Sequence, residues 1–138
     1  MANSFYTDFF DQLGSAGIAF LTDNIKVVLT DADYTFSAAH TALSDIGGTG
    51  RVATSGNLSG KTLVDGVFDA DDITFAAVAA GDTVTGFALY KDTGVESTST
   101  LIAFWDTDTG GAISIPTNGG DINLTWDSGA NKILSLYS

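Results

Sequence analysis

The sequence predicts an all-β protein: an antiparallel β-sandwich or jelly roll with a short N-terminal helix. The chain has 138 residues, and its 17 acidic residues are 16 Asp and a single Glu, Glu96. Asp favours turns and caps, whereas Glu favours helices, and the 16 Gly residues add further turn formers. Between these turns, apolar and polar residues alternate in short runs, as expected for half-buried strands.

The best helix candidate covers residues 3–14 (NSFYTDFFDQLG). Ser4 is expected to cap its N-terminus, because a serine hydroxyl can accept a hydrogen bond from a free backbone N–H of the first turn. Gly14 is expected to end it. A helix this short is marginal by itself in water, so its apolar side chains must pack on something.

The aromatic residues of this segment are predicted to share one helix face. Phe5, Phe9 and Leu13 are spaced at i, i+4 and i+8. This face packs either on the domain's own core or, as an arm, on a neighbouring subunit. We therefore divide the chain into an N-terminal helix or arm at 1–16 and a single β-sandwich domain at 17–138.

Strands are predicted wherever the period of the pattern changes to two. They lie at 24–29, 73–75, 86–89, 101–105, 122–126 and 132–137. Every residue of 101–105 is apolar, which indicates a strand covered on both faces. A short helix is predicted within residues 37–46, before the Gly47-Gly48 break.

The charge distribution excludes several kinds of partner. The formal net charge is -12, and the five basic residues are dispersed singly: Lys26, Arg51, Lys61, Lys91 and Lys132. Nucleic-acid binding needs clustered Lys and Arg, and an acidic membrane surface repels this chain. The sequence has no apolar run of membrane-spanning length, no secretory signal and no cysteine, so we expect a soluble protein made in a cytoplasm.

Two motifs suggest enzyme chemistry, and we expect neither to perform it. His40, the only histidine, lies in the predicted helix near Ser44, but no G-x-S-x-G elbow accompanies it. Residues 56–62 (GNLSGKT) resemble a phosphate-binding loop, yet three residues separate the first Gly from the Gly-Lys-Thr, where that loop needs four. We interpret 56–62 as a hairpin turn before a strand, and the protein as not an enzyme.

The acidic clusters are the only candidates for a metal site in the sequence. Asp69, Asp71 and Asp72 precede a predicted strand, and Asp106 and Asp108 open a segment, DTDTG, that resembles the start of a calcium loop. Such a loop closes on a Glu at its twelfth position, whereas this chain has a Thr there. With so many Asp residues, carboxylate pairs of the glycosidase kind also arise by chance. We expect turn-shaping carboxylates and no cofactor, with Asp106 and Asp108 the candidate calcium ligands.

Five stretches form a recognisable set: residues 23–29 (DNIKVVL), 66–75 (GVFDADDITF), 89–94 (LYKDTG), 118–126 (NGGDINLTW) and 131–133 (NKI). Together they resemble small virion structural proteins of tailed bacteriophages. The resemblance covers roughly residues 18–137 and rests on structural motifs. It implies a β-sandwich or jelly roll that decorates, or cements, the outer surface of a capsid. It also implies a homotrimer, a major capsid protein as partner, and a virion location after synthesis in the host cytoplasm.

Two binding functions remain open on the sequence. For a cement protein, the predicted partner-binding residues are the aromatic cluster Phe5, Tyr6, Phe9 and Phe10, since aromatic residues are enriched at interface cores. Deletion of residues 1–14 is then expected to leave a folded domain that no longer binds particles. The alternative is a tail or fibre protein that binds a host glycan through stacking residues, namely Tyr90, Trp105, Trp126 and Tyr137. Both Trp residues lie on strand faces assigned to the core, which weakens that alternative.

Overall fold

The central element of the fold is an antiparallel sheet of five strands. The computed structural model describes residues 4–108, 111–126 and 132–136. The strands of this sheet, in spatial order, are β1 (Ser4–Phe5), β9 (Leu101–Trp105), β8 (Gly86–Lys91), β2 (Ile25–Thr30) and β3 (Arg51–Thr54). Every pairing within it is antiparallel. The predicted all-β class with a short N-terminal helix is confirmed.

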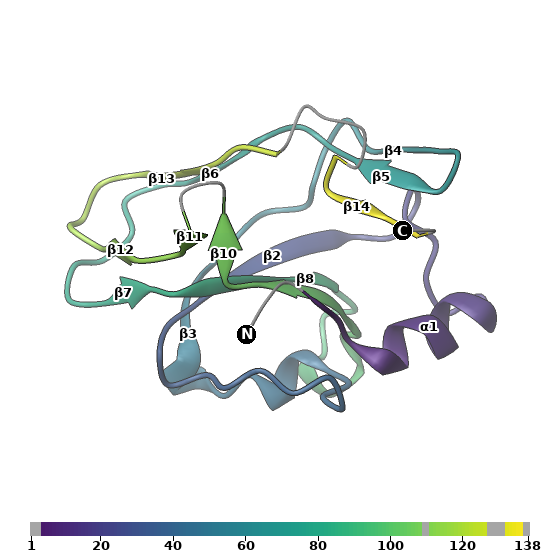
Figure 1. Ribbon diagram of the computed structural model, residues 1–138, viewed down its shortest axis with the longest axis horizontal. Helices are drawn as coiled ribbons and strands as arrows, with labels where there is room; N and C mark the ends of the chain where they lie inside the picture. Colours follow the sequence, from purple (N-terminus) through teal and green to yellow (C-terminus); the bar gives the residue numbers. More distant parts are fainter. Residues whose placement is uncertain (1–3, 109–110, 127–131, 137–138) are drawn as a thin grey trace.

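Smaller antiparallel sheets cover one face of the central sheet and make the structure sandwich-like (Figure 1). They are formed by β4 (Thr62–Val64), β5 (Val67–Asp69) and β14 (Leu134–Ser135); β6 (Ile73–Phe75) and β13 (Ile122–Leu124); β7 (Thr83–Val84) and β12 (Ile115–Pro116); and β10 (Thr107–Asp108) and β11 (Gly111–Ala112). The opposite face is covered by residues 31–50, which include the 3-10 helices η1 (Leu43–Asp45) and η2 (Gly48–Gly50) (Figure 1). A third, η3 (Glu96–Thr98), lies between β8 and β9.

Each face of the central sheet therefore has its own apolar core. Successive side chains of a strand point to opposite faces, so Val27 and Leu29 of β2 join one core while Val28 joins the other. Strand β9 has four buried residues in a row, which confirms that it is covered on both sides. The core under residues 31–50 comprises Tyr6, Val28, Leu43, Ile46, Ala88, Tyr90, Leu101 and Phe104, with Tyr34 and Phe36 packed against it.

The N-terminal segment differs from the prediction in where the helix begins. Helix α1 covers Thr7–Gly14, and it ends at the predicted glycine. Ser4 is not its cap, because Ser4 and Phe5 form β1 and pair with Phe104 and Ala103 of β9. The free edge of β9 supplies backbone hydrogen bonds to these residues, and the Tyr6 N–H continues the pattern by donating to the Ile102 carbonyl at 3.1 Å. Pairing with the sheet thus replaces the first helical turn.

Residues 37–46 are less helical than predicted. Only Leu43–Asp45 form a 3-10 turn, and His40 lies before it in irregular chain. The N–H groups of Asp45 and Ile46 donate to the Ala42 and Leu43 carbonyls, both at 2.9 Å, as in a single 3-10 turn. The Leu43 N–H donates to the Ser99 carbonyl at 2.8 Å, which ties this turn to the η3 region.

The turn between β4 and β5 is a two-residue hairpin turn, Asp65-Gly66, and Asp-Gly is a typical sequence for such turns. Both residues have positive φ, 52° and 80°, which matches the right-handed twist of the flanking strands and which Gly66 adopts without strain. The expected hairpin turn at 56–62 is wrong, because residues 56–61 connect β3 of the central sheet to β4 of the covering layer. In the last predicted strand, only Leu134–Ser135 form β14, and Tyr137 lies outside the described residues.

Replacement of Gly86 by alanine is expected to destabilise the protein by about 1–3 kcal/mol through overpacking. A Cβ at this position would lie 2.6 Å from the Phe104 ring and 2.8 Å from the Trp105 carbonyl oxygen, which belongs to the backbone and cannot rotate away. Gly47→Ala is the matched control, since a Cβ there meets nothing within 4 Å. Urea unfolding of both variants checks this, and equal midpoints for the two would contradict the close approach of β8 and β9.

Candidate functional site

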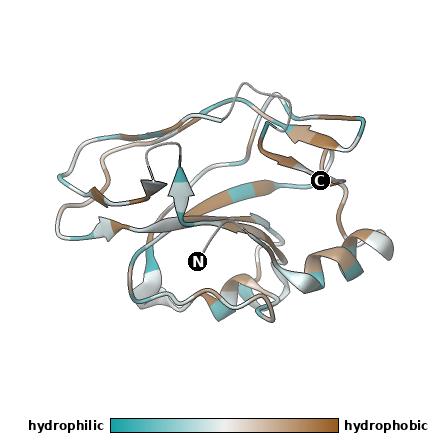
Figure 2. Ribbon diagram, viewed as in Figure 1, coloured by the Kyte–Doolittle hydropathy of each residue, from teal (hydrophilic) through white to brown (hydrophobic). Residues whose placement is uncertain are grey.

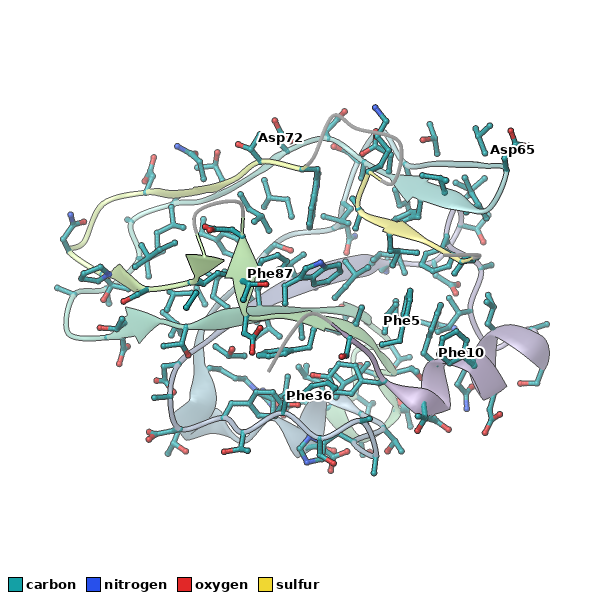
Figure 3. The ribbon with its side chains drawn as sticks, in the orientation of Figure 1. Phe5, Phe10, Phe36, Asp65, Asp72 and Phe87 are labelled. Carbon is teal, nitrogen blue, oxygen red and sulfur yellow. The ribbon has the colours of Figure 1, made fainter. Side chains whose placement is uncertain are left out.

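A row of phenylalanine rings joins α1 to the covering layer. The ring centroids of Phe9 and Phe20 are 5.8 Å apart, and those of Phe20 and Phe68 are 4.6 Å apart. On the other side, Phe10 contacts both Phe9, at 5.3 Å, and Phe5, at 5.2 Å. Figure 3 shows Phe5 and Phe10 at the α1 end of the molecule. This row holds the helix firmly against the body of the protein.

The four residues predicted to bind a partner divide into two groups. Tyr6 and Phe9 are completely buried, so they contribute to the protein's own cores and are not presented at the surface. Phe5 is half-buried and stacks on Phe9. Phe10 is 47% exposed. Of the aromatic cluster, Phe10 is thus the side chain best placed to reach a partner.

Exposed apolar residues concentrate near this row. Of the six large apolar side chains exposed in the described part of the chain, four come from α1, the turn before β2, and β4: Phe10, Leu21, Leu63 and Val64. Leu21 follows Phe20 in the chain, and Leu63 is the register partner of Phe68. Figure 2 shows apolar residues on both α1 and the β4–β5–β14 sheet at this end of the molecule. We call these four residues the apolar end.

Sequence reasoning missed three members of the apolar end. Leu63 and Val64 are consecutive apolar residues at the tip of a hairpin, so one of them must face away from the core. That pattern was the available signal for Val64. Leu21 lies in a turn without strand or helix periodicity, and no comparable signal marks it.

His40 takes part in a chain of side-chain hydrogen bonds and has no catalytic geometry. Its Nδ1 lies 2.9 Å from the Tyr34 hydroxyl, which in turn lies 2.8 Å from the Tyr6 hydroxyl. Burial, together with the hydrogen bond to Tyr34, raises the pKa of Tyr6 far above its ordinary value, and burial also raises the pKa of Tyr34. Within the described residues no serine hydroxyl bonds to His40. This series of hydrogen bonds ties residues 31–50 to Tyr6, the residue just before α1.

Asp45 fixes the backbone just after His40. Its Oδ2 accepts hydrogen bonds from the backbone N–H groups of Thr41, at 2.8 Å, and Ala42, at 3.2 Å. These bonds hold the pKa of Asp45 below its ordinary value of 3.8. The charged carboxylate is therefore favoured by folding.

Asp45→Ala is expected to show a pH-dependent effect on stability. Because the pKa is lower in the folded protein, the stabilisation by Asp45 is complete above the unfolded pKa and is lost as the pH falls through the folded pKa. The difference in unfolding free energy between wild-type and Asp45→Ala should be constant above about pH 6 and shrink towards about pH 3. Urea titrations across this range measure it, and a difference that grows in acid would contradict the assignment.

The loop at 56–62 and the acidic cluster, noted separately in the sequence, lie together in the structure. Residues 56–59 and 71–74 form a shallow pocket of about 140 Å³. The Ser59 hydroxyl donates to Asp71 Oδ2 at 3.2 Å, and a Cβ on Gly60 would lie 2.4 Å from the same carboxylate. A carboxylate against the loop repels phosphate, which disfavours phosphate binding at this position.

The candidate calcium ligands lie at a tight hairpin. Thr107 and Asp108 of β10 pair with Ala112 and Gly111 of β11, and the two residues that connect these strands lie outside the described residues. Among the residues that the structure describes, no group of three or more His, Asp or Glu side chains is close enough together to hold a metal ion.

The basic side chains are largely engaged within the protein. Lys26 Nζ lies 2.8 Å from Asp92 Oδ2, and Lys91 Nζ lies 3.2 Å from Asp23 Oδ2. The ammonium of Lys61 donates to the Asp23 carbonyl. Arg51 pairs with Glu96 at 2.6 Å, the only Arg with the only Glu of the chain. The charge left for a partner to meet is predominantly negative.

Of the four residues considered for glycan stacking, the three that the structure describes make internal contacts or are buried. Trp105 stacks on Phe87 with ring centroids 4.9 Å apart, and Trp126 contacts both of these rings. The Trp126 Nε1 donates to the Asp71 carbonyl at 3.1 Å. Tyr90 is buried, and burial raises its pKa to about 12.

Comparisons with known proteins assign no family. No protein-family model matches the chain, and no curated protein matches it at a significant level. In the described part of the chain, no helix is long and apolar enough to cross a membrane.

Proposed function

We propose that this protein is a virion structural protein of the capsid-decoration type, which binds the outer surface of a phage capsid and stabilises contacts between capsomers. The observation that carries the proposal is Phe10, an exposed aromatic side chain held rigid by rings anchored in the core. An aromatic residue that is already immobilised loses little conformational entropy when it binds a partner.

The polar groups also support a binding role over catalysis. Enzyme sites bring together a nucleophile, an acid or base and groups that stabilise charge. In the described residues, His40 is engaged by Tyr34, and the pocket at 56–59 and 71–74 is shallow and faces a carboxylate that Ser59 already holds. The sequence resemblance to virion proteins supplies the particular setting, and the homotrimer and the capsid partner are parts of the same proposal.

The acidic surface suits a decoration protein. A net charge of -12 favours solubility of the free protein, and it disfavours contact with packaged nucleic acid. A cement subunit has to remain monodisperse until it meets the capsid, and then bind through contacts repeated over many copies.

Antibody labelling of intact particles, viewed by electron microscopy, tests the proposal. Label over the whole head is the expected result. Label confined to the tail tip or fibres would contradict capsid decoration and favour the alternative, a tail or fibre protein that binds a host glycan. Absence of the protein from purified particles would reject both virion functions.

A further inference from the structure

We propose that Asn118 is a site of covalent modification by deamidation, and that a clasp between residues 77–82 and 117–121 keeps it unreacted until the clasp opens. Asn118 is the one Asn of the chain that a Gly follows. An Asn-Gly sequence is the most reactive context for this loss of ammonia, because glycine has no side chain to shield its backbone nitrogen. The inference goes beyond the proposed function and does not depend on it.

Deamidation begins with attack of a backbone nitrogen on a side-chain carbonyl. The Gly119 nitrogen would bond to Asn118 Cγ, its proton would pass to the departing amide, and the Cγ–Nδ2 bond would break with release of ammonia. The resulting succinimide ring takes up one water molecule and opens at either carbonyl, to aspartate or to isoaspartate. Ring closure needs the nitrogen and Cγ to meet in a reactive geometry, so contacts that hold the nitrogen in another orientation slow the reaction.

The structure engages the nucleophile of this reaction. The Gly119 N–H donates to the Val78 carbonyl at 2.8 Å, and the Val78 N–H donates to the Gly120 carbonyl at 2.9 Å. Gly119 has a φ of 85°, which glycine adopts without strain. The Asn118 side chain is also fixed, because its Oδ1 accepts a hydrogen bond from the Gly120 N–H at 2.9 Å. Attack by the Gly119 nitrogen therefore requires the loss of its bond to Val78.

Further hydrogen bonds hold the two segments of the clasp together. They are the connections from β6 to β7 and from β12 to β13, which Figure 1 shows at the end of the molecule opposite α1. The Thr117 N–H donates to the Asp82 carbonyl at 2.8 Å, and the Asp82 N–H donates to the Thr117 hydroxyl at 2.9 Å. The Ala77 N–H donates to Asp121 Oδ1 at 2.8 Å. Release of Gly119 is thus a local opening in which several bonds break together.

The hydrogen bonds, and not burial, protect this turn. Asn118, Gly119 and Gly120 are all exposed, so water reaches the reacting groups in the closed state as well. Isoaspartate would add a carbon atom to the main chain between positions 118 and 119. The bonds from Thr117 to Asp82 and from Gly119 to Val78 could then no longer form together. The modification therefore records an opening of the clasp, and its isoaspartate product prevents complete reclosure.

Deamidation and hydrogen exchange measured in the same buffer test the gate. Folded protein and a synthetic peptide of residues 114–124 are incubated at neutral pH, and products at position 118 are followed by tandem mass spectrometry. The folded protein is expected to react at least about tenfold more slowly than the peptide, which corresponds to an opening free energy of about 1.4 kcal/mol or more. The Gly119 amide proton should be protected from exchange by a similar factor, because both reactions proceed from the open state.

The other outcomes of this experiment each contradict part of the proposal. Reaction of the folded protein at the rate of the peptide would overturn the gate, and so would slow deamidation without protection of the Gly119 amide proton. A peptide that does not react would reject Asn118 as a modification site.

Matched variants show whether the clasp is the gate. Asp121→Ala removes the carboxylate that accepts the Ala77 N–H, and Thr117→Val removes the hydroxyl that bonds to Asp82. Each should speed deamidation of the folded protein by about threefold or more, as expected for the loss of one hydrogen bond. Peptides with the same substitutions correct for changes in the intrinsic rate. Asp11→Ala, which removes an exposed carboxylate from α1, should leave the rate unchanged. Equal acceleration in all three variants, or none in the two clasp variants, would overturn the gate.

Discussion

Replacement of Phe9 by alanine is expected to lower the free energy of unfolding by about 3–5 kcal/mol, the usual cost of removing a buried phenylalanine ring from a core. Phe9 is completely buried and lies in contact with Phe5, Phe10 and Phe20. The cavity left behind would lie between α1 and the covering layer. The rings around it come from three separate segments, β1, α1 and the turn before β2, so collapse can fill it only in part.

Phe10→Ala is the control for this variant, because it removes the same ring from the adjacent position. Since Phe10 is 47% exposed, the expected loss is below about 1 kcal/mol. Urea unfolding followed by tryptophan fluorescence gives both values. If the two variants lose similar amounts, or if Phe9→Ala is the milder change, α1 does not pack on the core as described.

The packing of α1 on the core also changes the result expected for deletion of residues 1–14. The sequence suggested an arm that could be deleted without harm to the domain. In the structure, the segment supplies the edge strand β1 and two fully buried side chains, Tyr6 and Phe9. We therefore expect the truncated protein to be destabilised, and single substitutions at Phe10 are the better test of binding.

Arg51→Ala is expected to cost about 2–3 kcal/mol, because it leaves buried acceptors without their charged donor. The Arg51 Nε donates to the Ile46 carbonyl at 2.7 Å, and its Nη2 donates to the Leu43 carbonyl at 2.9 Å. Leu43 and Ile46 are both buried, so water cannot readily replace the guanidinium. The guanidinium thus joins β3 to the segment that covers one face of the central sheet.

Two further variants show which contact of Arg51 matters. Glu96→Gln removes the ion pair but leaves both carbonyl contacts, and its cost should be small because Glu96 is exposed. Arg51→Lys keeps the charge but cannot reach the two carbonyls with a planar fork, so most of the loss should remain. Thermal unfolding of the three variants checks this order. A cost for Glu96→Gln as large as that for Arg51→Ala would show that the ion pair dominates.

The sequence was most informative for the strands of the central sheet. The pattern predicted the strands that became β2, β8 and β9, because both faces of the central sheet are buried and each face selects apolar residues. The Asp65-Gly66 turn was also recognisable, since few residue pairs adopt two successive positive φ angles.

The prediction failed where a long-range partner outweighed local preference. Helical spacing placed Phe5 on the same helix as Phe9, but the free edge of β9 binds Ser4 and Phe5 as a strand. Tertiary packing also explains why the candidate site was only partly predicted. The sequence marks an aromatic cluster, whereas only the packing decides that Phe9 is buried and Phe10 exposed. Burial of this kind is decided by tertiary packing, which no local pattern contains.

The measurement that tests the account most directly is add-back of purified protein to particles that lack it. Heads assembled from a genome without this gene are heated with and without the protein, and release of their nucleic acid is followed by dye fluorescence. Wild-type protein is expected to raise the release temperature, and Phe10→Ser is expected to require a higher concentration to do so while Val95→Ser does not. A release temperature that stays unchanged at saturating wild-type protein would contradict capsid decoration as the function.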